Sequence, residues 1–241
     1  MKKKTIALLL VMMMVFGITV GGTIAYLTDS KQVTNTFTVG NVQIKLDEAK
    51  TDVAGIVQMD DNRKEIRTEE GNRYKLIPNA QYTKDPTVTV LEGSEEAYVR
   101  VLVTISYSSQ WDEIFKTINE KRAENNEAML TAKDVLVGYD ETNWTYKSNV
   151  ENDDNTRTYE FWYNNPVAGT TGGNKLPALF TGIKVPGEVT NEQLETLVTY
   201  GEDEAGATVI KDQFEIDVVA HAIQTAGFAD ATDAWDNGWG K

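Results

Sequence analysis

The chain of 241 residues contains no cysteine and a single histidine, His221. The lack of cysteine excludes disulfides, thiolate metal sites and thiol nucleophiles, so stability has to come from the packed core. One histidine without an HExxH motif cannot supply an ordinary zinc site. His221 is therefore interpreted as a structural residue, with a metal ligand or a general base as the alternative. We expect no metal and no cofactor.

Other signatures of catalysis are missing as well. The sequence has no GxSxG nucleophile motif and no glycine-rich loop followed by Gly-Lys-[Ser/Thr]. Two acidic runs, Asp60-Asp61-Asn62 and Asp153-Asp154-Asn155, lack the alternating oxygen ligands and the distal glutamate of an EF-hand loop. Turn chemistry accounts for both runs. The sequence thus predicts no catalytic residue and a protein that is not an enzyme.

Positive charge is also scarce. The formal net charge is −14, from 23 basic and 37 acidic residues. Without Lys2, Lys3 and Lys4 the remaining chain has 20 basic residues against the same 37 acidic ones, a balance of −17. Such a charge repels nucleic acid and anionic membrane surfaces, so neither is expected as a partner.

The first 25 residues have the pattern of a secretory signal peptide. Three lysines precede an apolar run from Ile6 to Val20, and Thr23 and Ala25 have the small-residue spacing that signal peptidases prefer. We expect cleavage after Ala25, which makes Tyr26 the first residue of a secreted protein. The competing interpretation is an uncleaved anchor, because the apolar run approaches the roughly 20 residues that span a bilayer. If the signal peptide is cleaved, we expect contact with the membrane only during export.

Strand patterns dominate the rest of the chain. Gly40-Asn41 is a turn signal between alternating segments and predicts a hairpin. In the segment from Tyr98 to Tyr107 the odd-numbered residues are apolar, as in a half-buried strand. The expected strands are 33–39, 42–46, 83–91, 98–107, 143–146, 156–163, 179–185 and 214–224.

Helical spacing appears in three places. Trp111, Ile114, Phe115 and Ile118 predict a helix from Gln110 to about Ala123. Thr190 and Gln193 form a capping box for a short helix over residues 191–199, and a last turn is expected over 230–235. Long polar loops are expected at 48–72, 147–155, 164–174 and 201–206.

Strands in series, with one or two inserted helices and no βαβ alternation, predict a mainly β fold. The expected architecture is a β-sandwich or jelly roll. We expect residues 26–241 to form one secreted domain with long surface loops.

The N-terminal region resembles a known family. The run from Gly21 to Asp29 (GGTIAYLTD) and the run from Asn35 to Leu46 (NTFTVGNVQIKL) are similar to the start of the TasA/camelysin family. Those proteins are secreted biofilm-matrix and surface proteins that depend on the SipW signal peptidase. Looser similarity to its clostridial branch continues through residues 84–90, 97–103 and 220–235.

This resemblance implies a jelly-roll domain, processing by a SipW-type signal peptidase, and a role as a subunit of extracellular matrix or surface fibres. Family fibres form by donor-strand exchange, in which the N-terminal strand of one subunit completes the sheet of the next. The partner is then the chain itself, with other matrix or anchoring proteins as further candidates. The polymerisation residues expected here are Leu27, Val33, Phe37 and Val39. The alternative is that they form an ordinary first strand of their own domain.

Two other functions stay open on the sequence. The chain could be a secreted cell-surface binding module, an adhesin that uses its long loops and the aromatic rings of Trp162 and Trp239 on a glycan or protein ligand. Some relatives have been classed as metallopeptidases, and such an activity would depend on His221. The ligand set for that activity is missing from this sequence, so the metallopeptidase is the weaker alternative.

Overall fold

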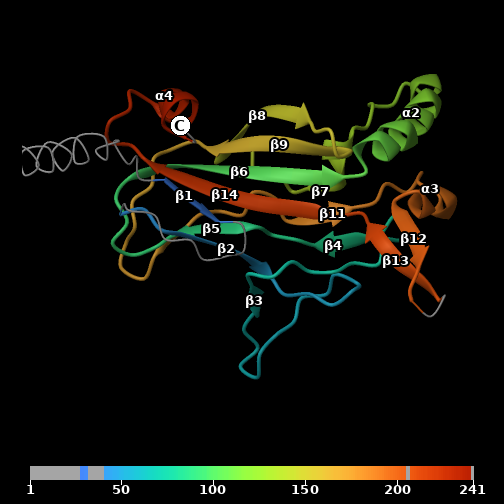
Figure 1. The fold of residues 1–241 in the computed structure, drawn as a ribbon, viewed down its shortest axis with the longest axis horizontal. Coiled ribbons are helices and arrows are strands. Elements are labelled where there is room, and N and C mark those ends of the chain that lie inside the picture. The colour runs from blue at the N-terminus through green and yellow to red at the C-terminus, as the bar shows by residue number, and fades with distance from the viewer. Residues whose placement is uncertain (1–27, 32–40, 205–206, 240–241) are drawn as a thin grey trace, which may run out of the picture.

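The computed structural model describes residues 28–31, 41–204 and 207–239, and within these the chain is mainly β (Figure 1). The expected signal peptide and the expected strand 33–39 lie outside the described residues. The largest sheet has five antiparallel strands in the order β1-β14-β6-β9-β8. These strands are β1 (Thr28–Lys31), β14 (Ile216–Gln224), β6 (Ala97–Ser106), β9 (Thr156–Tyr163) and β8 (Trp144–Glu151).

Strand β6 forms the centre of this sheet and confirms the predicted alternation. Val99, Val101, Val103 and Ile105 are buried, whereas the residues between them are half-buried on the opposite face. Side chains alternate between the two faces of a strand, so every second residue of β6 reaches the core. Its partners β14 and β9 contribute Ala220, Ala222, Tyr159 and Phe161 to the same core.

A second antiparallel sheet, in the order β10-β5-β2-β3, adds its buried face to the same core. Its strands are β2 (Ile44–Ala49), β3 (Arg67–Thr68), β5 (Thr87–Val90) and β10 (Asn174–Lys175). A third, three-stranded sheet consists of β4 (Gln81–Thr83), β11 (Gly182–Lys184) and β7 (Leu136–Val137). The core therefore joins residues from β2 to β14, along nearly the whole described chain.

The expected strand 83–91 was wrong as a single element. The structure divides it into β4, which ends at Thr83, and β5, which begins at Thr87, and the two belong to different sheets. Pro86 lies between them and has no backbone N–H to donate to a ladder, so a break at this point is favoured. The residues in the break, Lys84 and Asp85, use their side chains in ion pairs.

Helix α2 (Ser108–Glu124) confirms the predicted long helix. It buries Trp111, Ile114, Phe115 and Ile118 and leaves the opposite face in solvent. The capping box of α3 (Asn191–Glu195) is also confirmed, because the Thr190 hydroxyl accepts from Gln193 N–H, but the helix is shorter than the expected range 191–199, whose last two residues lie in a strand. Shorter helical segments are the 3₁₀ turn η1 (Ala132–Val135), α4 (Ala231–Asp233) and the π turn η2 (Ala234–Gly238). Among the described residues, no helix combines the length and apolarity that a membrane span requires.

All four segments expected to be loops contain strand residues: β2 and β3 reach into 48–72, β10 begins at Asn174, and two longer ladders reach into the other segments. β8 continues to Glu151, past the expected boundary at Tyr146, and pairs with β9 on both sides of an irregularity at Lys147. The expected loop 201–206 lies inside a hairpin of β12 (Val198–Glu202) and β13 (Thr208–Gln213). Polar composition hid both ladders, because most of their side chains are exposed and carry no apolar alternation.

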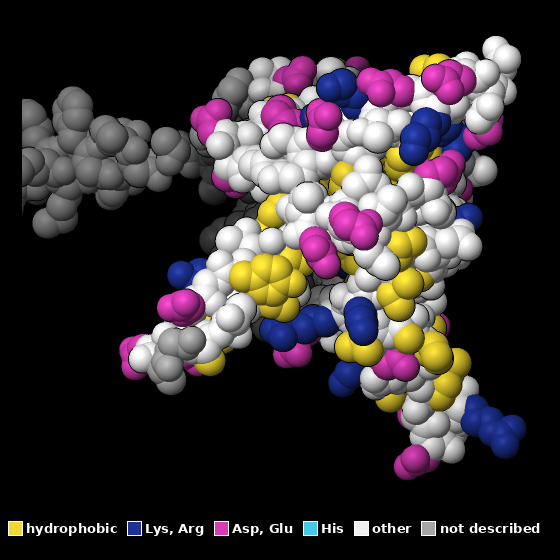
Figure 2. All heavy atoms as spheres, turned by 90° about the vertical axis from the view of Figure 1, so that its right-hand side faces the viewer, with side chains coloured by type: hydrophobic (Ala, Val, Ile, Leu, Met, Phe, Trp, Pro, Cys, Tyr) yellow, Lys and Arg dark blue, Asp and Glu magenta, His cyan; other side chains and the backbone are white. Residues whose placement is uncertain are grey.

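The β12–β13 hairpin and the segment 50–66 project from the body of the molecule as two arms (Figure 2). The second arm is held by backbone pairing of Thr51 with Val57 and of Met59 with Glu65. Both arms expose large apolar side chains, namely Val53, Ile56 and Met59 on one and Tyr200, Val209 and Ile210 on the other.

The contrast between core and arm gives a matched stability test. Ile44 is fully buried in β2, whereas Ile56 on the arm is 66% exposed. We expect Ile44→Ala to lower the free energy of unfolding by about 2–5 kcal/mol through lost burial and cavity formation. The control Ile56→Ala should change it by less than about 0.5 kcal/mol. Urea denaturation followed by tryptophan fluorescence measures both, and equal effects would contradict the placement of the core.

Candidate functional site

The edge of the five-stranded sheet is formed by β1, which pairs with the C-terminal strand β14. The pairing is antiparallel, with Thr28 opposite Ile223 and Lys31 opposite Ala220. β1 is four residues long and lies close to β2 as well as to β14. The edge strand of the sheet is thus an N-terminal segment, and its neighbour β14 lies near the C-terminus.

Within the described residues, β14 pairs with β1 only from Ala220 to Ile223, and Ile216 to Val219 have no strand partner on that side. A groove of about 250 Å³ lies beside this part of β14, and a smaller one adjoins it. Its walls combine apolar and charged side chains. They include Leu46, Tyr74, Leu76, Phe214, Ile216 and Val218 together with Glu48, Lys84 and Asp217.

The residues proposed from the sequence for assembly and processing fall outside the described part of the chain. These are Leu27, Val33, Phe37 and Val39 for polymerisation, and Thr23, Ala25 and Tyr26 for signal cleavage. The structure places the intervening segment Thr28–Lys31 in the sheet of its own chain. That placement is the arrangement of an ordinary first strand within one molecule.

His221 lies on β14, on the face opposite the main core, and is 9% exposed. Its Nδ1 accepts a hydrogen bond of 3.1 Å from Arg100 Nε on β6. The Arg100 guanidinium also donates to Glu160 Oε1 at 3.1 Å, and Trp162 Nε1 donates to the same oxygen at 2.7 Å. Burial, followed by the charge of Arg100, lowers the pKa of His221 to about 4. His221 is therefore neutral near pH 7.

The C-terminal segment covers this polar group. The Trp239 ring stacks on His221 with centroids 4.2 Å apart, and the Arg100 guanidinium lies 4.4 Å from the Trp235 ring centroid. The backbone approaches so closely at Gly238 that an added Cβ would lie 2.3 Å from the Phe228 ring. Figure 1 shows α4, which leads into this segment, over one end of the sheet.

These contacts involve the residues on which the two alternative functions depend, namely Trp162 and Trp239 for the binding module and His221 for the metallopeptidase. Trp162 packs against Trp235 and lies 4.1 Å from Lys147 Nζ, measured to its ring centroid, and Trp162 and Trp239 are both half-buried. Asp60, in one of the acidic runs, uses its carboxylate to accept backbone N–H groups of Asn62 and Lys64 at 2.8 Å. The expected turn chemistry accounts for that carboxylate.

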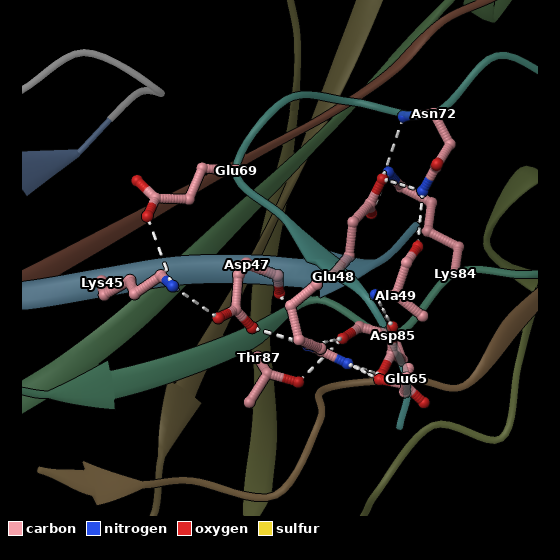
Figure 3. Close-up of polar contacts among 11 residues, drawn as sticks. Lys45, Asp47, Glu48, Ala49, Glu65, Glu69, Asn72, Lys84, Asp85 and Thr87 are labelled. Carbon is pink, nitrogen blue, oxygen red and sulfur yellow. Dashed lines mark hydrogen bonds and ion pairs between the residues drawn. The ribbon is translucent and has the colours of Figure 1, made fainter. Parts of the chain in front are cut away.

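A polar cluster on β2 was missed by the sequence analysis (Figure 3). One part of it is an ion-pair network around Arg67, which binds Asp47 at 2.7 Å, Glu65 at 2.8 Å and also Asp85. Asp85 accepts in addition from the Ala49 N–H at 2.6 Å. The network thereby ties β2 and β3 to the break between β4 and β5.

The other part of the cluster is a triad of Glu48, Asn72 and Lys84. Lys84 Nζ lies 2.7 Å from Glu48 Oε2, and Asn72 Nδ2 donates to Glu48 Oε1 at 2.8 Å. Lys84 and Glu48 are 5% and 7% exposed. Burial, and then the negative charge of Glu48, raises the pKa of the neighbouring Tyr74 to about 12, so this phenol stays protonated. An expected loop boundary at Glu48 concealed the triad, although the alternation of Val42, Ile44 and Leu46 places residue 48 on the buried face.

Across the described ranges, no group of three or more histidine, aspartate or glutamate side chains is arranged to hold a metal ion. Comparisons with models of protein families, with curated proteins and with solved structures returned no match for the chain.

The environment of His221 predicts a loss of stability in acid. Unfolded histidine has a pKa near 6.5, so between pH 6.5 and about 4 the unfolded chain binds a proton that the folded chain excludes. The stability that neutral His221 contributes is fully present above pH 6.5. The free energy of unfolding falls by ~3 kcal/mol from this source as the pH falls to about 4. In His221→Asn this component should be absent.

Unfolding free energies of both proteins from pH 7.5 to 4 test this expectation. The carboxylates titrate in both, so the difference between wild type and variant isolates His221. Parallel curves over the whole range would show that His221 is not held neutral by its surroundings.

Proposed function

We propose that this chain is a secreted, non-enzymatic subunit of extracellular matrix or surface fibres, with a jelly-roll-like domain at residues 26–241. In this proposal subunits join by donor-strand exchange, as the resemblance to the TasA/camelysin family implies. The observation that carries the proposal is the outer side of β14: among the described residues, β1 pairs with four of its nine residues, and a groove borders its first residues.

The edge has the properties of a strand acceptor. Unpaired N–H and C=O groups at a sheet edge bind an added strand through main-chain hydrogen bonds, and adjacent pockets select its side chains. The occupant β1 contributes four residues. Removal of residues 1–25 would leave it near a new amino terminus at Tyr26, so a single chain end has to leave the edge for exchange to occur.

The register of β1 matches the positions proposed for polymerisation. Thr28 pairs with Ile223 and Lys31 with Ala220, so odd-numbered residues lie opposite even-numbered residues of β14. Ala220 and Ala222 are fully buried on the core side of that strand. A donor strand that keeps this register puts Leu27 and Val33 on the core side of β14, with residue 33 opposite Val218 beside the groove, and Phe37 and Val39 continue past Ile216, where β14 begins. Leu27 and Val33 would then be buried by the neighbouring subunit.

Exchange of this kind gives a filament. Donor strand and acceptor edge are different surfaces, so each subunit adds to the next head to tail without closing. The charge of −17 on residues 26–241 opposes association, and protonation of carboxylates in mild acid would weaken this repulsion. SipW-type processing would release the donor, and anchoring proteins would serve as additional partners.

The absence of cysteine permits a direct test by cross-linking. Residues that face each other on antiparallel strands have Cα atoms close enough for a disulfide. Equal amounts of the single variants Lys31→Cys and Ala220→Cys, mixed after removal of residues 1–25 and oxidised, should give a disulfide-linked dimer. The control pair Lys31→Cys with Val150→Cys, on the exposed far side of the sheet, should give none.

Two results would count against strand exchange. The double variant Lys31→Cys/Ala220→Cys should form its disulfide within one chain when the protein is diluted. If no such disulfide forms, the register of β1 on β14 is wrong. Closure within one chain without any mixed dimer means that β1 stays in its own molecule. If glycan binding that is lost in Trp162→Ala accompanies this second result, the protein is instead a surface binding module.

A further inference from the structure

The triad of Glu48, Asn72 and Lys84 combines the three groups that amide-bond formation between side chains requires: an amine, a carboxamide and a carboxylate that contacts both. We propose that Lys84 Nζ attacks the side-chain amide of Asn72 and forms an intramolecular isopeptide bond, with Glu48 as the proton-transfer residue. This cross-link is independent of the proposed assembly, since it lies inside one chain.

The hydrogen bonds give each atom of the Asn72 amide a defined role. Its Oδ1 accepts from the Thr51 N–H at 2.8 Å, and its Nδ2 donates to Ala49 O and to Glu48 Oε1, both at 2.8 Å. The reverse orientation of the amide would set its oxygen against two acceptors, so the network fixes which end is the leaving nitrogen. The Asn72 backbone N–H, at 3.1 Å from Glu48 Oε1, holds the residue in place.

Glu48 bridges the two reacting side chains. One of its oxygens is 2.7 Å from Lys84 Nζ and the other is 2.8 Å from the leaving nitrogen of Asn72. Figure 3 shows Glu48, Asn72 and Lys84 pointing toward one another at the end of β2. The amine and the amide are therefore neighbours on a single carboxylate, held by β2, the segment after β3 and the break after β4. Such positioning replaces an encounter between separate molecules.

The proposed reaction is balanced. Glu48 Oε2 accepts a proton from the Lys84 ammonium group, and the freed amine attacks Asn72 Cγ to form a C–N bond. Negative charge develops on Oδ1, where the Thr51 N–H stabilises it in the manner of an oxyanion hole. The protonated Glu48 carboxyl donates this proton to Nδ2, the bond from Cγ to Nδ2 breaks as the C=O bond re-forms, and Nζ gives its second proton to the departing ammonia. The sum is one amide bond and one ammonium ion per chain, with no oxidant or other reactant.

The surroundings favour this chemistry over a simple ion pair. Lys84 and Glu48 are withdrawn from water, where a charged pair is costly to bury. Asn72, Tyr74 and Lys84 all line the groove beside β14, which gives the released ammonium ion a path to solvent. A covalent link between residues 72 and 84 would also supply the kind of restraint that cysteine does not provide in this chain.

Mass spectrometry of the purified full chain tests the proposal. Its mass after denaturation should be lower than the sequence mass by one ammonia molecule. Trypsin should yield a branched peptide in which Thr68–Arg73 is joined to Leu76–Arg100, because the modified Lys84 is no longer cleaved. Lys84→Arg should abolish both signals. Glu48→Gln, in which proton transfer is impaired, should slow their appearance by about 10²-fold or more.

The matched control is Lys45→Arg, since Lys45 also forms ion pairs on β2, with Asp47 and Glu69, but contacts no carboxamide. This variant should keep the mass loss and the branched peptide. An unmodified mass with separate tryptic peptides in the wild type would overturn the proposal without any need for a folded variant. A loss of ammonia that persists in Lys84→Arg would also overturn it, because ring closure of Asn72 onto its own backbone gives that result.

Discussion

Strand β14 pairs with β6 along all of its nine residues, and the other features of the molecule depend on this ladder. It brings the C-terminal part of the chain to the centre of the sheet and sets His221 against Arg100. The opposite side of β14 becomes the sheet edge, where β1 binds and the groove begins. A single strand thus contributes to the core on one face, to a covered polar group on the other, and to the candidate assembly site along its edge.

Charge has two different roles in this protein. The net charge of −14 makes copies of the chain repel one another, whereas ion pairs within the fold join strands that are distant in sequence. Arg67 and Lys84 carry most of this second role, since between them they connect β2, β3 and the segment between β4 and β5. Removing Lys84 would leave the buried Glu48 carboxylate without its cation, which costs more than the loss of an exposed ion pair. Glu48 also brings the amine of Lys84 and the carboxamide of Asn72 together.

The sequence was informative where one physical signal dominated. Alternation in β6, helical spacing in α2 and the capping box of α3 each predicted the observed element. It failed for β8, β12 and β13, whose exposed side chains leave no apolar pattern, and for the break at Pro86, where two sheets meet. The triad could not be predicted from spacing, because Asn72 and Lys84 lie 24 and 36 residues from Glu48 and meet it only in the folded chain. The role of His221 as a buried partner of Arg100 likewise depends on strand register rather than on any motif.

The most direct test of the central claim is negative-stain electron microscopy of the chain without residues 1–25, at neutral and at mildly acidic pH. The account predicts regular thin filaments, favoured in acid, and folded monomers when residues 26–39 are deleted as well. Filaments that persist in the deletion variant, or monomers under both conditions in the parent protein, would contradict assembly through the N-terminal strand.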